Sequence, residues 1–259
     1  MKVCVLASGS EGNVTFVETK QHKILLDIGT TVKYIKDSLS ELSVRLDDIE
    51  YVLITHVHND HVKALKGLIK KYHPYICVSP MMFSELPELH DYEKIILYDK
   101  EIKLDDAKIE IIKTSHDASD SRSFIITSDD SSLVYLTDTG YINQKNFEAL
   151  KDKKLYLFES NHDIEMLIKG PYPKFLKDRV MGPYGHLSNK DSSVYLAKLI
   201  GKNTKRIVLT HLSQKNNTEE KALETIKEVF KEYEVKFNQK NICCARQKEK
   251  SELIEIWLK

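Results

Sequence analysis

The chain has 259 residues, enough for one large domain or two small ones with a sizeable core. Its 39 basic residues (Lys and Arg) balance its 39 acidic ones, so any attraction to nucleic acid must come from a local patch or from bound metal. The four cysteines show no Cys-x-x-Cys spacing and no apolar run approaches ~20 residues, which argues against a disulfide framework, a thiolate metal site and a membrane span. A cytoplasmic protein without a membrane anchor is therefore expected.

The first half of the chain is predicted to begin with strands and then to alternate strands with helices. Apolar runs and turn residues predict strands at 3–7, 14–18, 24–28, 51–54, 75–79, 95–98 and 102–104. Apolar positions spaced by three and four residues predict helices over 31–43 and from about residue 62, and another helix is expected to begin at Pro80. Asp60 and His61 are then expected near the first turn of the second helix.

The second half is predicted to be rich in strands, with helices between and after them. Strands are predicted at 108–114, 123–128, 132–137, 154–158, 206–210, 242–244 and 253–257. Helices are predicted from Ser188 to Ile200 and from Asn217 to about Tyr233, and the Gly- and Pro-rich segment 160–187 is predicted to hold broken helical pieces. With no repeat or linker, residues 1–259 are expected to form one α/β domain, with sheets face to face and helices outside.

The loop after the predicted strand 51–54 concentrates coordinating side chains. His56, His58, Asp60 and His61 lie within six residues, directly after an apolar run. Neutral imidazole and carboxylate are the ligands that suit zinc, manganese and iron. Polar loops normally use Ser, Gly and Asn instead, so this segment predicts a metal site.

Three other predicted strands also end in coordinating residues. His116 follows the strand at 108–114, Asp138 follows 132–137, and His211 follows 206–210. Each of these residues alone is weak evidence for a metal site, because a single His after a strand is more often structural than a ligand. Together with the His-rich loop, they are the pattern expected when several strands present ligands at one edge of a sheet.

This pattern resembles the metallo-β-lactamase superfamily, and in particular its binuclear hydrolases. The resemblance implies an αβ/βα four-layer sandwich, in which two mixed sheets are flanked by helices and hold two divalent ions, Zn or Mn, at one edge. It implies one ion on His56, His58 and His116, a second on Asp60, His61 and His211, and Asp138 between them. Asp27 matches a carboxylate that orients a ligating imidazole in the superfamily.

Further motifs narrow the resemblance. The segments 8–13, 159–163, 185–189 and 210–214, with 165–167 and 170–173 between them, are together similar to the bacterial YycJ family, also called WalJ or VicX. Gly-His-Leu-Ser and Thr-His-Leu-Ser-Gln also resemble motifs of ribonuclease Z. The YycJ resemblance covers nearly the whole chain and implies a 5′-to-3′ exonuclease acting on double-stranded DNA by metal-hydroxide attack on phosphate. The first motif departs from the family at Glu11 and Val14, and neither is a predicted ligand.

The residues that would serve catalysis on such a site are Asp60, His186, Glu159 and His162. A sugar alkoxide is a poor leaving group, so a proton donor would raise the rate about 10²–10⁴-fold. His186 is the first choice, by its likeness to the ribonuclease Z motif, with Glu159 orienting it. His162 competes for the same role.

The remaining polar and basic residues carry weaker expectations. Ser8, Ser10 and Asn13 would either donate hydrogen bonds to a phosphate or form a structural turn. His22, His73 and His90 are expected at the surface. The basic clusters at 63–71 and 145–154 are expected to be solvated helix faces rather than a track for a phosphate backbone.

Two other functions remain open from the sequence. The balanced charge favours a small-molecule hydrolase acting on a lactone, thioester or cyclic phosphodiester. The other alternative is a metal-free binding or regulatory protein, and the complete set of predicted ligands argues against it. The sequence does not decide whether the metal is zinc or manganese, or whether the nuclease cleaves from an end or internally. It favours DNA over RNA as the substrate without excluding RNA, and it leaves the oligomeric state open.

Overall fold

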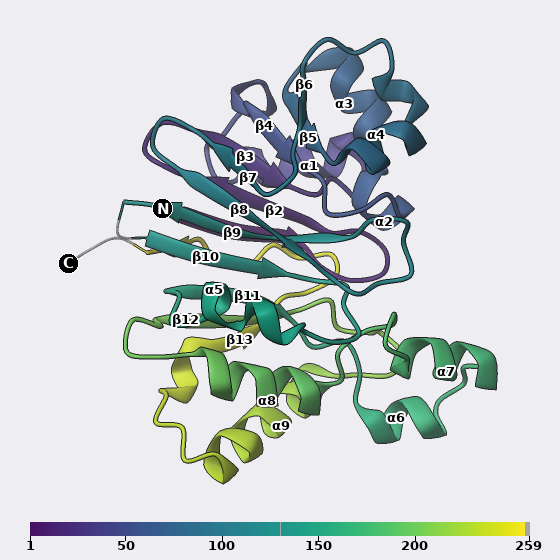
Figure 1. The fold of residues 1–259 in the computed structure, drawn as a ribbon, viewed down its shortest axis with the longest axis vertical. Helices are drawn as coiled ribbons and strands as arrows, with labels where there is room; N and C mark the ends of the chain where they lie inside the picture. The colour runs from purple at the N-terminus through teal and green to yellow at the C-terminus, as the bar shows by residue number, and fades with distance from the viewer. Residues whose placement is uncertain (130, 257–259) are drawn as a thin grey trace.

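Two mixed seven-stranded sheets pack face to face, and helices cover the outer face of each sheet (Figure 1). The computed structural model describes residues 1–129 and 131–256 of the chain. The four layers, helix–sheet–sheet–helix, confirm the αβ/βα sandwich predicted from the sequence. In the described residues, no helix combines the length and apolar character needed to cross a membrane.

The first sheet is formed mainly by the first hundred residues and has the strand order β14-β1-β2-β3-β4-β5-β6. Its strands are β1 (Lys2–Ala7), β2 (Val14–Glu18), β3 (Lys23–Leu26), β4 (Tyr51–Leu53), β5 (Tyr75–Val78), β6 (Ile95–Leu97) and β14 (Ile254–Glu255). Strands β3 to β6 run parallel, whereas β14, β1, β2 and β3 pair antiparallel. The helices of this half are α1 (Val32–Ser40), α2 (Asn59–Val62), α3 (Leu65–Lys71) and α4 (Pro80–Glu85), with 3-10 turns η1 (Leu46–Asp48) and η2 (Pro87–Leu89).

The second sheet has the strand order β13-β12-β11-β10-β9-β8-β7. Its strands are β7 (Glu101–Lys103), β8 (Lys108–Lys113), β9 (Arg122–Ser128), β10 (Ser131–Leu136), β11 (Leu155–Glu159), β12 (Arg206–Thr210) and β13 (Ile242–Cys244). Its helices are α5 (Phe147–Leu150), α6 (Ile164–Lys169), α7 (Lys174–Met181), α8 (Asn189–Leu199) and α9 (Glu219–Glu232), with 3-10 turns η3 (Gln144–Asn146) and η4 (Gln239–Asn241). Figure 1 shows α5, α8 and α9 over the outer face, whereas α6 and α7 extend beyond the sheet on the same side as α2.

Strand β11 shows how the layers are held together. Leu155 and Leu157 belong to the core between the two sheets, whereas Tyr156 and Phe158 belong to the core under α8 and α9. Successive side chains of a strand point to opposite faces, and both faces of this strand are covered. That is why its sequence is an unbroken apolar run.

Parallel strand directions bring the ends of several strands to one edge of the sandwich. Strands β10, β11 and β12 are parallel, and so are β3 and β4. Strand β8 runs in the direction of β10, because each is antiparallel to β9. The residues that follow these strands are those that the sequence singled out as ligands, so the fold delivers them to a common edge.

The structure differs from the predicted elements in a few places. The strand predicted at 24–28 ends at Leu26, because Asp27 adopts a left-handed backbone conformation (φ 57°), and the helix predicted from residue 62 is divided between α2 and α3. The helix predicted from Asn217 begins at Glu219 and ends at Glu232, and Tyr233, its C-cap residue, is 42% exposed. Within the strand predicted at 253–257, Ile254–Glu255 pairs with β1, and Trp257 lies outside the described residues.

The prediction of a surface position for His22 is wrong, whereas His73 and His90 are exposed as predicted. His22 is 9% exposed, with Nδ1 3.1 Å from Oε2 of Glu50 and Nε2 3.8 Å from Oδ1 of Asp106. Glu50 precedes β4 and Asp106 lies in the β7–β8 turn, so the ring joins loops of the two sheets. Neither partner is close to His22 in sequence, so no local pattern indicated its burial.

Candidate metal centre

The His-rich loop begins where β4 ends and leads into α2. Thr55 is fixed by Asp27, which accepts hydrogen bonds from both the backbone N–H and Oγ1 of Thr55 at 2.8 and 2.9 Å. His58 is the N-cap residue of α2, so Asp60 and His61 lie in its first turn, as predicted. Nε2 of His56 and Nδ1 of His58 are 3.1 Å apart, and two ring nitrogens this close are suited to a shared cation.

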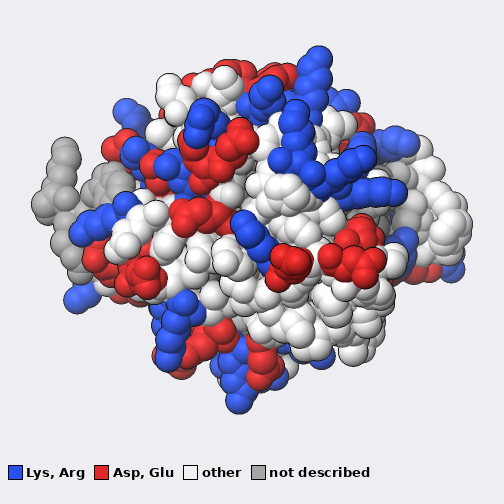
Figure 2. Space-filling view, turned by 90° about the horizontal axis from the view of Figure 1, so that it is seen from above, with Lys and Arg blue, Asp and Glu red and all other residues white. Residues whose placement is uncertain are grey.

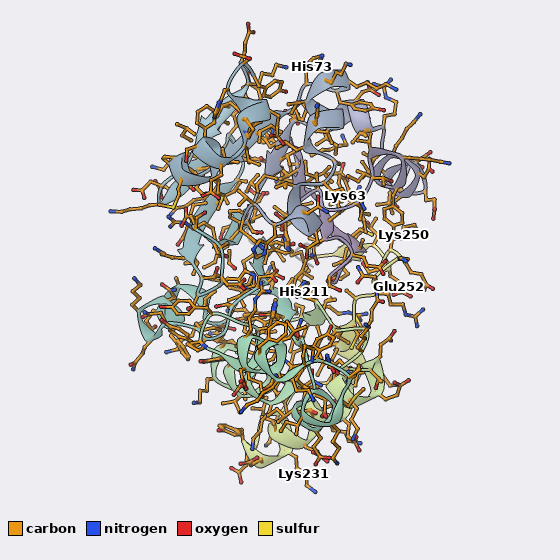
Figure 3. All side chains as sticks on the ribbon, turned by 90° about the vertical axis from the view of Figure 1, so that its right-hand side faces the viewer. Lys63, His73, His211, Lys231, Lys250 and Glu252 are labelled. Atoms are coloured by element: carbon orange, nitrogen blue, oxygen red, sulfur yellow. The ribbon has the colours of Figure 1, made fainter. Side chains whose placement is uncertain are left out.

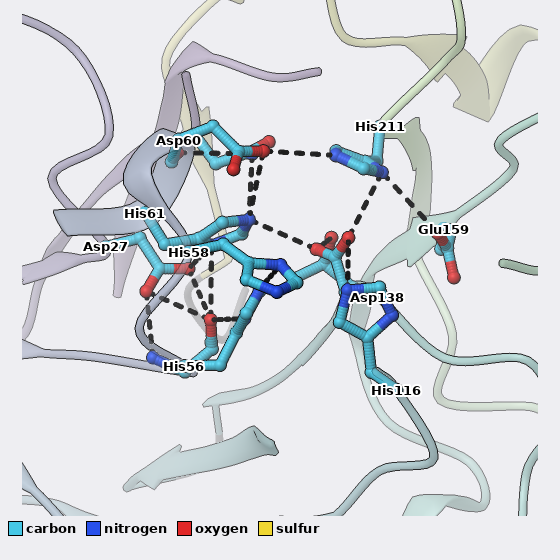
Figure 4. A network of polar contacts seen from close by, with 12 residues as sticks. Asp27, His56, His58, Asp60, His61, His116, Asp138, Glu159 and His211 are labelled. Atoms are coloured by element: carbon cyan, nitrogen blue, oxygen red, sulfur yellow. Dashed lines mark hydrogen bonds and ion pairs between the residues drawn. The ribbon is translucent and has the colours of Figure 1, made fainter. Parts of the chain in front are cut away.

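Three residues of the second half reach the same place (Figure 4). Asp138 lies in the middle, with Oδ2 3.3 Å from Nε2 of His61 and Oδ1 3.5 Å from Nδ1 of His211. Its Oδ1 is also 3.8 Å from Nε2 of His116. Figure 3 looks onto this edge and shows His211 near its centre, where the two halves meet. The seven predicted ligands thus converge on one site.

Two of the side-chain groups that could hold a cation match the sets implied by the resemblance. Within each group, one ligand atom per residue lies within 4.8 Å of the others. The matching groups are His56, His58 and His116, and Asp60, His61 and His211. Asp138 belongs to two further groups, one with His56 and His61 and the other with Glu159, His186 and His211. Asp138 therefore lies close to ligands of both sets, which is the position expected of a carboxylate between two cations.

The backbone is strained at three site residues that follow strands. Asp27, Asp138 and His211 have φ angles of 57°, 52° and 57°. This left-handed region is uncommon for residues other than Gly, and Asp and His tolerate it better than most. Such outliers persist where surrounding contacts fix them, and they cluster at functional sites. The turn directs each side chain into the site immediately after its strand ends.

A buried network behind the centre includes two residues that the sequence analysis missed. Asp27 accepts hydrogen bonds from Oγ1 of Thr55 and from the Tyr135 hydroxyl at 3.0 Å, and its Oδ2 lies 2.8 Å from Nδ1 of His61. Thr55 Oγ1 also contacts Nδ1 of His56 at 3.0 Å. Thr55 stands directly beside the motif and could have been noticed there. Tyr135 is 108 residues from Asp27 in sequence, and nothing local marks it.

A contact with the backbone fixes the orientation of the His116 ring. Its Nδ1 lies 3.2 Å from the backbone oxygen of Gly185, which makes Nδ1 the donor in a neutral ring. Nε2 is then the acceptor nitrogen, and it faces the carboxylates of Asp117 at 3.2 Å and Asp138 at 3.8 Å. Contacts of this kind with the other ring nitrogen are typical of metal-binding histidines.

The buried carboxylates of the site give it negative charge that a bound cation would neutralise. Burial favours the neutral acid of Asp138, but His211 and His61 outweigh this effect and hold the pKa of Asp138 well below its ordinary value. Burial likewise opposes protonation of His211, yet the nearby carboxylates of Asp138, Asp60 and Glu159 raise the pKa of His211 to about 10. The carboxylates thus attract protons to the imidazoles, and a cation would satisfy the same charge by replacing those protons.

The residues present fit divalent cations. Nε2 of His211 is buried and has no hydrogen-bond partner in the described part of the chain, as expected of a nitrogen that is free to bind a metal. Burial lowers the pKa of His56 well below its ordinary value, which keeps this imidazole neutral, the form that binds metal.

The predicted proton donors are placed differently. His186 is partly exposed, with Nδ1 2.7 Å from Oε1 of Glu159. Glu159 is fully buried and also accepts from the backbone N–H of Thr139 at 2.9 Å. His162 is 2% exposed, and its Nδ1 has no hydrogen-bond partner among the described residues. Burial lowers the pKa of His162 to about 4.

Ser8 and Asn13 lie behind the centre rather than on its open side. Ser8 Oγ accepts from the backbone N–H of His211 at 2.8 Å, and Nδ2 of Asn13 lies 3.0 Å from Nε2 of His61. Both side chains are buried. Ser10 is exposed and lines a pocket of about 180 Å³ together with His186 and His211.

Comparison with known proteins agrees with this geometry. Residues 22–212 match the beta-lactamase superfamily domain. The chain is 33% identical to exodeoxyribonuclease YycJ of Bacillus anthracis, over 88% of each chain, and 35% identical to exodeoxyribonuclease WalJ of Streptococcus pneumoniae, over 85% of each.

Among solved structures, the fold is similar to that of the metallo-beta-lactamase fold protein YhfI from Bacillus subtilis, with a TM-score of 0.71 at 16% identity over 96% of this chain and 98% of that one. Human tRNase Z, short form, gives a TM-score of 0.64 at 15% identity over 97% of this chain and 99% of that one. At these identities the likeness shows the fold alone, whereas the match to the curated relatives is much closer. The chain therefore belongs to the beta-lactamase superfamily and, within it, to the family of the YycJ and WalJ exodeoxyribonucleases.

Proposed function

We propose that this protein is a cytoplasmic, single-domain phosphodiesterase that cleaves DNA with two bound divalent cations, zinc or manganese. We further propose that it is an exonuclease acting 5′ to 3′ on double strands. The observation that carries the proposal is a site suited to two cations in a chain 33–35% identical to relatives named exodeoxyribonuclease. Residues His56, His58 and His116 would hold one cation, Asp60, His61 and His211 the other, and Asp138 would bridge the pair.

When bound, the cations would supply a water molecule of lowered pKa and positive charge against the phosphate. The protein's own residues fix the geometry for this chemistry. Asp27 holds the ring of His61, and the backbone oxygen of Gly185 holds the ring of His116. Because these contacts exist before substrate arrives, little reorganisation is needed in the reaction.

We assign the proton donor to His186 rather than His162. His186 is partly exposed, and its Nδ1 lies 2.7 Å from Oε1 of Glu159, which fixes the orientation of the ring. Burial holds the pKa of His162 near 4, so this ring is neutral at pH 7 and lacks the acidic proton of an imidazolium. Burial opposes ionisation of Glu159, but contacts with His186 and His211 lower the pKa of Glu159, so it stays a carboxylate that can hold the His186 ring in place.

Ser10 is the remaining proposal for a direct substrate contact, because it lies in the pocket that opens at His186 and His211. Arg179 lines the same pocket and is paired with Asp117. Ser8 would instead position His211 through its backbone N–H, and Asn13 would hold the turn at Gly9, with which its side chain exchanges two hydrogen bonds. This arrangement gives the leaving nucleotide polar surroundings on the open side of the centre.

A small-molecule hydrolase is the competing function, and its support is the balance of acidic and basic residues. On the face seen in Figure 2, basic and acidic side chains are interspersed. The zero net charge provides no overall steering of a polyanion. Attraction to DNA would then have to arise at the site itself.

The test uses the whole protein, stripped with a chelator and reloaded with Zn²⁺ or Mn²⁺. Duplex DNA labelled at either 5′ or 3′ ends should be shortened only by the reloaded protein, and Asp138→Asn should abolish both cleavage and metal binding. If the reloaded protein leaves DNA and RNA intact but hydrolyses a lactone or thioester, the competing function is established instead.

A further inference from the structure

We propose that a second pocket, beside His116, binds the nucleotide next to the scissile phosphodiester of a nucleic-acid strand, its lysines taking the phosphate and its tyrosines the base. This proposal rests on the proposed function. The pocket has a volume of about 340 Å³. Its wall includes the predicted ligand His116 and the four residues that would recognise the nucleotide, Lys113, Lys145, Tyr141 and Tyr184.

The pocket is formed by three segments that are tied to one another. They follow β8, β10 and α7. Ser115 accepts a hydrogen bond from the Gly140 N–H at 2.8 Å through its backbone oxygen, and its hydroxyl donates to the backbone oxygen of Pro183 at 2.8 Å. The Ser115 N–H also donates to Thr139 Oγ1 at 3.1 Å. These bonds fix the pocket wall relative to Asp138, so the pocket is largely formed before a ligand binds.

Two lysine side chains line this pocket, and neither is paired with an acidic group of the described residues. Neither Lys113 nor Lys145 forms an ion pair with any group in residues 1–129 or 131–256. The pocket's carboxylate, Asp120, is paired with Arg122 at 2.9 Å. By contrast, Lys151, in the same basic segment as Lys145, is paired with Glu148. The pocket therefore offers a phosphate two free ammonium groups next to the candidate metal centre.

Two aromatic side chains in the same pocket remain open to solvent. Tyr141 is 43% exposed and Tyr184 is 64% exposed. Aromatic rings that bind single strands stack on bases of any sequence, and they occur together with basic groups that follow the backbone. Exposed lysines alone are usually just solvated. Their combination with exposed tyrosines, in a hollow that reaches a metal ligand, favours a nucleotide subsite.

The first experiment measures binding rather than cleavage. The full-length protein in EDTA is titrated into a short labelled single-stranded oligonucleotide, with fluorescence anisotropy read over a range of NaCl concentrations. Lys113→Gln/Lys145→Gln should weaken binding about tenfold at low salt and reduce the slope of log K against log salt by about 0.7 per lysine. Tyr184→Ala should weaken binding about tenfold with an unchanged salt slope.

Matched controls remove the same groups elsewhere. Lys198→Gln/Lys231→Gln makes the same change in net charge on α8 and α9, and Figure 3 shows Lys231 at the far end of the molecule from His211. Tyr233→Ala removes an exposed tyrosine at the end of α9. Both controls should bind as the wild type does. Equal losses in the control and pocket variants would mean general electrostatic attraction and would overturn the proposal.

The second experiment separates this pocket from the chemistry. With metal restored, the pocket variants should raise KM for an oligonucleotide about tenfold, while cleavage of bis(para-nitrophenyl) phosphate stays as in the wild type. Loss of both activities together would show damage to the metal centre and contradict the proposal. If the wild type leaves nucleic acid intact, the proposed function fails. If it cleaves DNA and the pocket variants bind and cleave equally well, the subsite alone fails.

Discussion

Oδ2 of Asp27 lies 2.8 Å from Nδ1 of His61, and both side chains are fully buried. With Nδ1 occupied, the other ring nitrogen of His61 faces Asp60 at 3.6 Å and Asp138 at 3.3 Å. Asp27 itself is held by Thr55 and Tyr135. Asp27 follows β3 and Tyr135 lies in β10, so two strands fix the position of Asp27. Asp27 in turn fixes the orientation of His61, a predicted metal ligand.

Replacing Asp27 by Asn should lower metal affinity about 10–100-fold. The amide keeps the size of the carboxylate and tolerates the left-handed backbone, but it no longer supplies the negative charge that holds the ring. Affinity is measured by competition with a chromogenic chelator.

Asp129→Asn is the matched control, because Asp129 is another Asp with positive φ (49°) and is exposed, outside the centre. This control should keep wild-type affinity. An Asp27→Asn protein that binds metal within about twofold of the wild type would rule out the orienting role.

Replacing His186 by Ala should lower turnover about 10²–10⁴-fold while the bound metal stays constant. The reason is that the variant loses a proton donor and keeps all seven predicted ligands. Turnover is measured on labelled duplex DNA, and metal content by elemental analysis after desalting.

His186 also belongs to a group that could hold a cation with Asp138, Glu159 and His211. A parallel fall in metal content would therefore identify it as a ligand instead. His90→Ala, which removes an exposed histidine next to Phe83, should change neither quantity.

The sequence could group most residues of the candidate metal centre because they lie at strand ends. An apolar run followed by His or Asp marks both the strand and the residue it delivers, and parallel strands end at the same edge. His116, Asp138 and His211 could therefore be grouped without knowing any contact between them. The helix predicted from Ser188 likewise begins there, with Ser188 as the N-cap residue whose Oγ accepts from the Asp191 N–H at 3.1 Å.

Other features depend on contacts between distant segments, which no local pattern records. Tyr135 supports Asp27 across 108 residues, and His22 is buried by loops of both sheets. The Lys145 segment looked like a uniform solvated face. Folding separates Lys145, which lines a pocket beside His116, from Lys151, which is paired with Glu148.

The buried ring of His162 should make stability fall between pH 6.5 and about 4. The unfolded chain protonates this histidine near its ordinary pKa of 6.5, whereas burial lowers its pKa in the folded protein to about 4. The unfolded state thus binds more protons in this window, and the free energy of unfolding falls as pH falls, by up to about 3 kcal/mol. Above pH 6.5 the contribution is fully present.

This effect is measured by urea unfolding of metal-stripped protein at a series of pH values, so that metal release does not contribute. His162→Gln should lose this part of the pH dependence, whereas His90→Gln, at an exposed position, should follow the wild type. Parallel curves for the wild type and His162→Gln would contradict the prediction.

A methyl group at Gly140 should disturb the centre by separating two backbone segments. A Cβ there would lie 2.4 Å from the Pro183 oxygen and 2.6 Å from the Gly182 oxygen, both backbone atoms that cannot rotate away. Gly140 follows Asp138 by two residues, and His186 follows Pro183 by three. The two segments therefore carry the predicted bridging ligand and the predicted proton donor.

Gly140→Ala should therefore lower turnover on DNA about 100-fold, because small displacements of catalytic groups are costly, and should lower unfolding stability by about 1–3 kcal/mol. Kinetics on labelled duplex and urea unfolding give the two quantities. Gly67→Ala in α3 is the matched control, since its Cβ would meet only the side-chain Cγ2 of Val32 at 3.0 Å. That control should keep full turnover and gain up to about 1 kcal/mol from helix propensity. Wild-type turnover in Gly140→Ala would mean that the segment carrying His186 can shift without consequence, and that His186 is not the proton donor.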